Sequence, residues 1–196
     1  SISLRGNGPW RSLCPVSDLP AALGGAARHV VRNALTASAL AHALGLDEDA
    51  IAAGLRAFRS DETDNPGRAN RFDVGGARVV VDYAHNAHGL SALADLAETW
   101  EARRRLVLFG EVPALLERRL SERGVPADAC VRRADPTEGT RYALDWVEAG
   151  DLAVLLALTQ RDEVLALVKA AAGSASPVPR APLGADPTPG SARPHR

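Results

Sequence analysis

The chain has 196 residues, of which 46% are hydrophobic and 24% are charged, and its formal net charge is -1. This composition suits a globular core of one domain, or of one domain with a piece of another, and it contains no basic block typical of nucleic-acid or membrane-surface binding. The longest apolar runs, such as Leu152 to Leu158, are too short to span a bilayer, and no signal segment opens the chain. Cys14 and Cys130 show neither metal nor disulfide spacing, so we expect a cytoplasmic protein.

The first 58 residues predict a pair of helices joined by a short turn. Residues 1–25 are rich in Gly and Pro and have room for one or two short strands. From Ala26 onward, apolar side chains recur at the i, i+3, i+4 spacing of one buried helix face, and Gly45 ends this pattern. Asp47 is placed to cap a second helix, whose apolar face carries Ile51, Leu55 and Phe58.

The remaining chain alternates between strand and helix patterns. Residues 59–67 are polar and turn-rich, and we interpret them as a linker between domains. A hairpin turning at Gly75-Gly76 follows, and the pattern then predicts strands at 79–81, 106–109, 129–132 and 152–158, with helices at 90–100, 112–123, 137–148 and 162–172. This alternation predicts an α/β fold with a Rossmann-like, mostly parallel sheet and helices on both faces. Residues 173–196 have no periodicity and predict a disordered tail.

Two charged residues frame the end of the first buried strand. Asp82 directly follows the apolar run 79–81, and the carboxyl ends of strands are where open α/β sheets bind ligands. Its carboxylate is suited to accept both hydroxyls of a ribose. Arg68 ends the tight turn that starts at Asn65, and its planar guanidinium is suited to a phosphate or the same ribose. A second interpretation is that Arg68 and Asp82 simply pair with each other at a domain surface.

Several polar residues follow Asp82, and each has a structural alternative. His85 is either functional or an ordinary core histidine, and Asn86 is placed to cap a helix beginning near Ala87. His85 and His88 have a spacing that metal ligands can have, but no Cys or carboxylate completes a set, so we predict no metal site here. We interpret the run Arg103-Arg104-Arg105 as a solvated helix end, favoured by the helix dipole.

The segments Asn65-Pro-Gly-Arg68 and Val81-Asp-Tyr-Ala-His-Asn86 together resemble the C-terminal domain of the Mur ligase superfamily, and fit its cyanophycin synthetase-like branch best. The enzymes of this superfamily use ATP to join a carboxylate to an amino acid. The resemblance implies that Arg68 and Asp82 lie over the bound ATP. It also implies that Tyr83, His85 and Asn86 belong to the same nucleotide-facing motif.

A second match lies in the first predicted helix. The run from His29 to Asn33 resembles the His-Asn-x-x-Asn signature of the superfamily's central domain, with Val30 in place of the first Asn. The match implies that Asn33 reads adenine, since an amide can donate and accept hydrogen bonds on one edge.

The resemblance implies three structural parts and a tail. Residues 1–58 are expected to be the C-terminal remnant of a Mur ligase central domain, 59–67 the linker, 68–172 the C-terminal domain, and 173–196 the disordered tail. No Gly-x-x-x-x-Gly-Lys-Ser/Thr motif occurs in the sequence, so we expect a fragment that lacks the ATP-binding half and its magnesium ligands.

The resemblance also predicts a shortened sheet. Gly110 runs directly into Glu111, where the superfamily usually has a Gly-Asp-Arg loop, and a helix and a strand are expected to be missing. Losing a central strand would leave unpaired edges on its neighbours, unless the sheet closes up with a changed order.

The expected function is part of an ATP-dependent carboxylate–amine ligase that acts through an acyl phosphate. The chain would contribute the domain that closes over ATP and presents the amino acid, with Mg²⁺ held by the missing half. Its expected partners are the nucleotide, the amino-acid substrate and the ATP-binding half, in cis or in trans, and we expect the chain alone to be inactive. The alternatives are a non-catalytic partner or regulatory module, a decayed fragment, or a folylpolyglutamate synthase or peptidoglycan Mur ligase.

Overall fold

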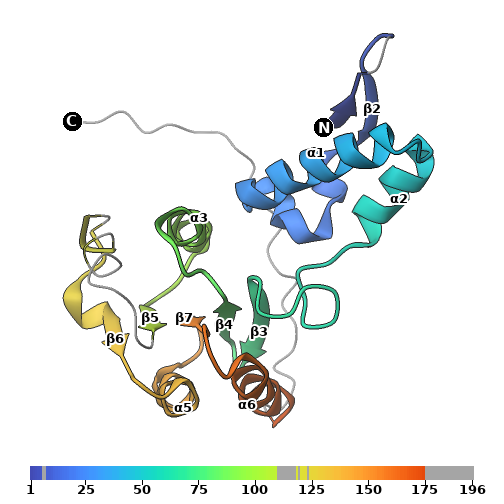
Figure 1. Cartoon of the computed structure of the whole chain (residues 1–196). Helices are drawn as coiled ribbons and strands as arrows, with labels where there is room; N and C mark the ends of the chain where they lie inside the picture. Colours follow the sequence, from blue (N-terminus) through green and yellow to red (C-terminus); the bar gives the residue numbers. More distant parts are fainter. Residues whose placement is uncertain (6–7, 110–117, 119, 123, 175–196) are drawn as a thin grey trace.

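The structure is a computed structural model, which describes residues 1–5, 8–109, 118, 120–122 and 124–174. Figure 1 shows these residues as two units joined by a loop. We call residues 1–58 the helical unit and residues 68–174 the sheet unit. Of the predicted helix 112–123, residues 118 and 120–122 are described and are helical, and the rest of it lies outside the described residues, as does the predicted tail beyond residue 174.

The helical unit has a core of its own. A short antiparallel hairpin of β1 (Ile2–Leu4) and β2 (Arg11–Cys14) is followed by two 3-10 turns, η1 (Val16–Asp18) and η2 (Pro20–Gly25), and then by α1 (Arg28–Ala43) and α2 (Glu48–Ala57). As predicted, the Asp47 side chain caps α2 by accepting from the backbone N–H of Asp49 at 2.8 Å. Side chains from the hairpin and both helices pack together around Ile2, Ala34 and Ile51.

The sheet unit is built on five strands in the order β3-β4-β7-β5-β6. The strands are β3 (Asn70–Val74), β4 (Ala77–Asp82), β5 (Arg105–Phe109), β6 (Cys130–Arg132, preceded by the 3-10 turn η3, Ala127–Ala129) and β7 (Leu152–Leu156). The predicted hairpin is confirmed, since β3 and β4 pair antiparallel across Gly75 and Gly76, whereas the other strand pairs are parallel. The last strand in the chain, β7, lies in the centre of the sheet and pairs with β4 on one side and β5 on the other. Neither β4 nor β5 therefore has an unpaired edge facing the centre of the sheet.

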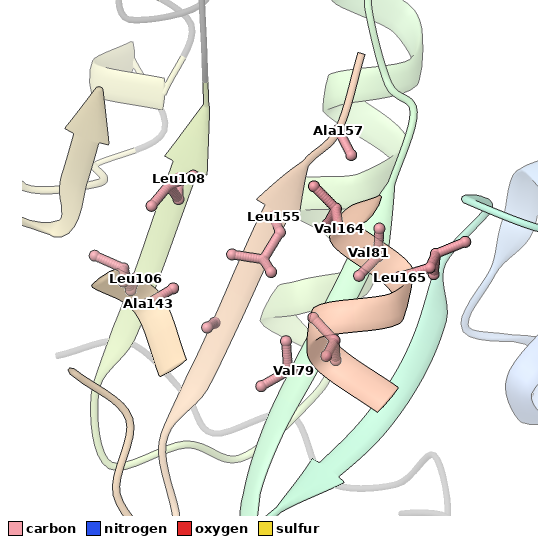
Figure 2. Close-up of a cluster of buried hydrophobic side chains, with 11 residues drawn as sticks. Val79, Val81, Leu106, Leu108, Ala143, Leu155, Ala157, Val164 and Leu165 are labelled. Carbon is pink, nitrogen blue, oxygen red and sulfur yellow. The ribbon is translucent and has the colours of Figure 1, made fainter. Parts of the chain in front are cut away.

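Helices cover both faces of this sheet, which confirms the predicted α/β class. Figure 1 shows α3 (Ala87–Glu98) on one face and α5 (Pro136–Trp146) and α6 (Arg161–Ser174) on the other. Successive residues of β4 point to opposite faces, so Val80 packs on the α3 side. Val79 and Val81 pack with the α5 and α6 side chains, as Figure 2 shows. The last helix ends at Ser174, two residues beyond the end of the predicted helix 162–172.

The interpretation of Arg103-Arg104-Arg105 as a solvated helix end is wrong. Helix α3 ends at Glu98, and Arg105 already begins β5. The side chains of Arg103 and Arg104 both bind the carboxylate of Asp151, whose side chain has 0% exposure. The sequence pattern missed this pairing because the partners are separated by 47 residues or more and meet only when β7 enters the sheet.

The helical unit contacts the sheet unit through a small apolar cluster. Ala27 at the start of α1, Ala69 before β3 and Leu96 of α3 are buried together, with Leu23 and Trp100 packed against them. The contact brings the first turn of α1 to the carboxyl end of β4. None of the helices in the described ranges is long and apolar enough to cross a membrane.

Candidate functional site

Asp82 lies where the sequence predicted it, at the carboxyl end of β4. The residue is only 8% exposed, and its Oδ2 accepts a hydrogen bond from the backbone N–H of Ala69 at 2.8 Å. The backbone N–H of Ala84 donates a second bond to the carboxylate. A carboxylate offers about four acceptor positions, so these two bonds leave capacity for a ligand's hydroxyl groups. Burial raises the pKa of Asp82, because removal from water disfavours the charged form.

The raised pKa of Asp82 predicts a specific pH dependence. A carboxyl group whose pKa is higher in the folded than in the unfolded protein favours folding most at low pH. The wild-type protein should therefore lose stability relative to Asp82→Asn as the pH rises above the ordinary carboxyl value of 3.8 and through the raised folded pKa. Urea unfolding of both proteins between about pH 4 and pH 7 measures this difference.

A matched control is Asp145→Asn, which changes an exposed carboxylate on α5. Its unfolding free energy should follow that of the wild type across this pH range. A free-energy difference between the wild type and Asp82→Asn that stays constant with pH would contradict the raised pKa.

The loop that carries Arg68 is organised by a residue that sequence reasoning missed, Asn70. This fully buried side chain accepts from the Gly67 N–H at 2.6 Å and donates to the Asn65 carbonyl oxygen at 2.9 Å. Asparagine is a frequent turn residue, so its position just after Asn65-Pro-Gly-Arg68 is the signal that could have identified it. The loop also holds Ala69 in the left-handed region at φ 50°, and this conformation aims its N–H at Asp82.

Arg68 does not form the ion pair with Asp82 that we considered as an alternative. Within the described part of the chain, its guanidinium carbon lies 5.1 Å from the centre of the Tyr83 ring, in a cation–π arrangement. Its positive charge nevertheless offsets part of the rise in the pKa of Asp82 that burial causes. The Tyr83 ring in turn contacts the ring of His85, with centroids 5.2 Å apart. Arg68 therefore keeps its hydrogen-bonding edge available for an anion.

His85 and Asn86 lie at the start of α3. His85 is exposed, so it is not a core histidine, and its Nδ1 lies at a hydrogen-bond distance of 3.0 Å from the Tyr83 carbonyl oxygen. Asn86 caps α3 as predicted, since its Oδ1 accepts from the Gly89 N–H at 2.8 Å. The described residues contain no group of His, Cys, Asp or Glu side chains arranged to hold a metal ion.

Helix α1 brings His29 to this site from the other unit. The pKa of His29 is lowered mainly by burial, while the nearby carboxylate of Asp82 raises it and the charges of His88 and Arg68 lower it further. Its Nδ1 atom is buried and has no hydrogen-bond partner among the residues that the structure describes. Asn33 lies one helical turn further along the same face of α1. The structure thus assembles His29, Arg68 and Asp82 across the boundary between the units, with Asn33 one turn beyond.

The chain is similar in sequence to two kinds of known proteins, a cyanophycin synthetase and a UDP-N-acetylmuramate–L-alanine ligase. No family model matches the chain. It is 29% identical to a cyanophycin synthetase from Crocosphaera subtropica in an alignment 174 positions long, which covers 70% of this chain and 20% of that protein. Over 105 residues, 52% of this chain, it is 37% identical to a UDP-N-acetylmuramate–L-alanine ligase from Roseiflexus sp. and covers 21% of it. The chain therefore spans about a fifth of the length of these relatives.

The fold also resembles that of a solved ligase. The structure of a pseudomurein peptide ligase type C from Methanothermus fervidus superposes with a TM-score of 0.50 at 18% identity. The match covers 70% of this chain and 35% of that chain. At this level of identity the likeness shows a shared α/β fold.

Proposed function

This chain is related over part of its length to the Mur ligase superfamily, and we propose that it supplies the domain of an ATP-dependent acid–amine ligase that closes over the nucleotide and presents the amino acid. The relatives that support the proposal are amide-bond-forming ligases. The observation that carries it is the position of Asp82, which lies buried at the end of β4 beside Arg68 and opposite His29 of α1.

The proposed reaction has two steps. A substrate carboxylate attacks the γ-phosphorus of ATP, the bond to the β–γ bridging oxygen breaks, and an acyl phosphate and ADP form. An amine then attacks the acyl carbon, phosphate leaves, and the amine loses a proton. Magnesium and a phosphate-loop lysine would neutralise the transferring group. Residues 1–196 contain no phosphate-loop motif, and the described residues contain no metal-ligand cluster, so we assign both to a phosphate-binding half in the same polypeptide or in a partner.

Each site residue has a proposed role in holding the nucleotide. Arg68 would donate its guanidinium to a phosphate, and the buried Asp82 would accept hydrogen bonds from the ribose. Asn33 would read the adenine. The Tyr83 ring would hold the Arg68 guanidinium in place, and His85 would hold the Tyr83 ring, consistent with the contacts between Arg68 and Tyr83 and between Tyr83 and His85.

Closure of the sheet unit onto the helical unit would complete the site. The two units meet through a small apolar contact and are joined by the loop of residues 59–67, which suits a domain that moves over its substrate. Closure would exclude water from the reactive acyl phosphate. Asn86 would fix the start of α3 beside the site, and we assign it no chemical step.

Calorimetry with Mg-ATP tests this function. We expect the wild-type chain to bind weakly, because the phosphate-loop contacts are absent, and we expect Asp82→Ala and Arg68→Ala to lose the binding. Arg141→Ala and Asp145→Ala, two exposed changes on α5, should leave it unaltered. A well-folded wild-type chain that binds no nucleotide, or unchanged binding in both site variants, would contradict the proposal.

The chain alone should form no amide bond. Incubation of the purified chain with Mg-ATP, a carboxylate and an amine should release no phosphate above background. Detectable ligation would show that a phosphate-binding half is not required.

A second candidate is a non-catalytic nucleotide-binding module. The described residues that we assign to the site, such as the buried Asp82 and Arg68, are suited to hold a nucleotide, and none of them is assigned a chemical step. The test is to add a phosphate-binding half, either as the natural continuation of the chain or as a separate subunit. Ligation after this addition supports the enzyme, whereas nucleotide binding without ligation supports the module.

A further inference from the structure

A cavity lies between α3, the strands β5 and β7, and residues 124–126, on the face of the sheet that α3 covers in Figure 1. Its volume is about 460 Å³, a size that is common for small-molecule sites. Its walls are mainly apolar, and they include Leu90 and Leu93 of α3, Val107 of β5, and Val154 and Leu156 of β7. The cavity is therefore suited to the apolar part of a ligand.

Charged side chains line the cavity where α3 ends and β5 begins. They are Glu98, Arg103, Arg104 and Arg105. Arg103 and Arg104 are held in their ion pairs with Asp151. Glu98 also has an interaction partner within the fold. This leaves Arg105 as the charged side chain that a ligand could contact without breaking an existing pair.

Arg105 is exposed and is held in place by one hydrogen bond. Its Nη2 donates to the Trp100 carbonyl oxygen at 2.7 Å, and it forms no ion pair with another described residue. This bond fixes the guanidinium just beyond the end of α3, while its remaining N–H groups stay available. Arg105 can therefore bind an anion and keep its contact with the protein.

The Arg105 side chain lies on the same face of the sheet as the cavity. Alternate residues of a strand point to the same face, and Val107, two positions further along β5, packs on the α3 side. The neighbouring strand agrees, because Arg105 pairs with Leu152 and Val107 pairs with Val154. Both partners belong to the apolar cluster beneath α3. A positive charge thus borders an apolar cavity.

This charged end of the cavity is separate from the nucleotide-facing residues. In the register of the sheet, Leu152 of β7 lies between Arg78 of β4 and Arg105 of β5. Asp82 lies four positions further along β4 than Arg78, which is about 13 Å in the strand direction. Arg105 and Asp82 therefore lie at opposite edges of the sheet.

We propose that this cavity binds a small carboxylic acid with an apolar body. The apolar body lies against the side chains of α3, β5 and β7, and the carboxylate binds the Arg105 guanidinium. The match is chemical, since a guanidinium presents parallel N–H donors to the two oxygens of a carboxylate. The site is a second ligand site of the sheet unit, and it does not depend on the proposed nucleotide-binding function.

Calorimetry of the full chain with octanoate and with 1-octanol tests the site. The two probes share an apolar chain of the same length, but only octanoate carries a charge. We expect the wild-type chain to bind octanoate about tenfold more tightly than octanol, as one charge-assisted hydrogen bond would cause. Equal affinities, or no binding of octanoate, would overturn the proposal.

Two variants locate the bound probe. Arg105→Gln should weaken octanoate binding about tenfold and leave octanol binding unaltered, because it removes only the charge at the end of the cavity. Ala94→Leu places a larger side chain of α3 in the cavity and should weaken the binding of both probes. Arg141→Gln, the same charge change at an exposed position of α5, should affect neither probe.

Urea unfolding of each variant shows whether it keeps its fold. Unchanged octanoate affinity in Arg105→Gln would refute the carboxylate contact. Unchanged affinity for both probes in a folded Ala94→Leu variant would refute the cavity as the site. Because Arg105 is exposed, its substitution tests the proposal even if Ala94→Leu does not fold.

Discussion

Replacing Asp151 with Asn should lower the free energy of unfolding by about 3 kcal/mol, the cost of breaking a buried ion pair. The Asp151 side chain has 0% exposure and accepts from Arg103 Nε at 3.2 Å and from Arg104 Nη2 at 2.5 Å. It also accepts from the backbone N–H of Glu148 at 3.0 Å. We expect the lower end of the range for such pairs, because both guanidinium groups are about half exposed. Urea unfolding measures the change.

The effect should depend on pH in a defined direction. Hydrogen bonding from Arg104 is the main reason that the pKa of Asp151 lies well below its ordinary value of 3.8. A carboxylate with a lowered folded pKa stabilises the protein above its unfolded pKa, and this contribution is lost as the pH falls toward the folded pKa. The difference in stability between wild type and Asp151→Asn should therefore be largest near neutral pH and shrink below about pH 4.

The exposed change Asp145→Asn again provides the control, and its effect should stay within about 0.5 kcal/mol. The prediction would be wrong if Asp151→Asn unfolded at the same urea concentration as this control. It would also be wrong if the loss of stability persisted undiminished at acid pH.

Replacing Asn70 with Ala should destabilise the protein by about 2 kcal/mol and also abolish its nucleotide affinity. The change removes the acceptor of the Gly67 N–H and the donor to the Asn65 carbonyl oxygen, in a position with 0% exposure. Each buried group left without a partner costs about 1–3 kcal/mol. Because the same loop places Arg68 and aims the Ala69 N–H at Asp82, we expect binding to be lost with the loop geometry.

Two measurements separate these effects. Urea unfolding gives the loss of stability, and calorimetry with Mg-ATP at low temperature, where the variant stays folded, gives the loss of binding. Thr63→Ala, an exposed change in the same loop, should change neither quantity. If Asn70→Ala bound ATP as the wild type does, the loop would hold its shape without the buried amide, and the positioning role of Asn70 would be refuted.

Local features of the structure could be predicted from the sequence alone. The alternation of apolar strands with amphipathic helices predicted the α/β class, and Gly75-Gly76 predicted the hairpin. Asp47 and Asn86 were identified as helix caps, because a cap is made by residues within one turn of each other. The position of Asp82 at a strand end follows from the same short-range pattern. The nucleotide-binding role of this residue stays a prediction.

The tertiary structure alone decided the contacts between distant segments. It placed β7 between β4 and β5, and this brought Asp151 to the two arginines that the sequence indicated as solvated. In the folded chain Arg68 lies over the Tyr83 ring and does not pair with Asp82. His29 of α1 lies close enough to Asp82 for the charge of that carboxylate to affect its pKa. Periodicity and capping signals describe neighbours within a few residues of each other, whereas strand order and the pairing of buried charges depend on which surfaces become buried together when the sheet closes.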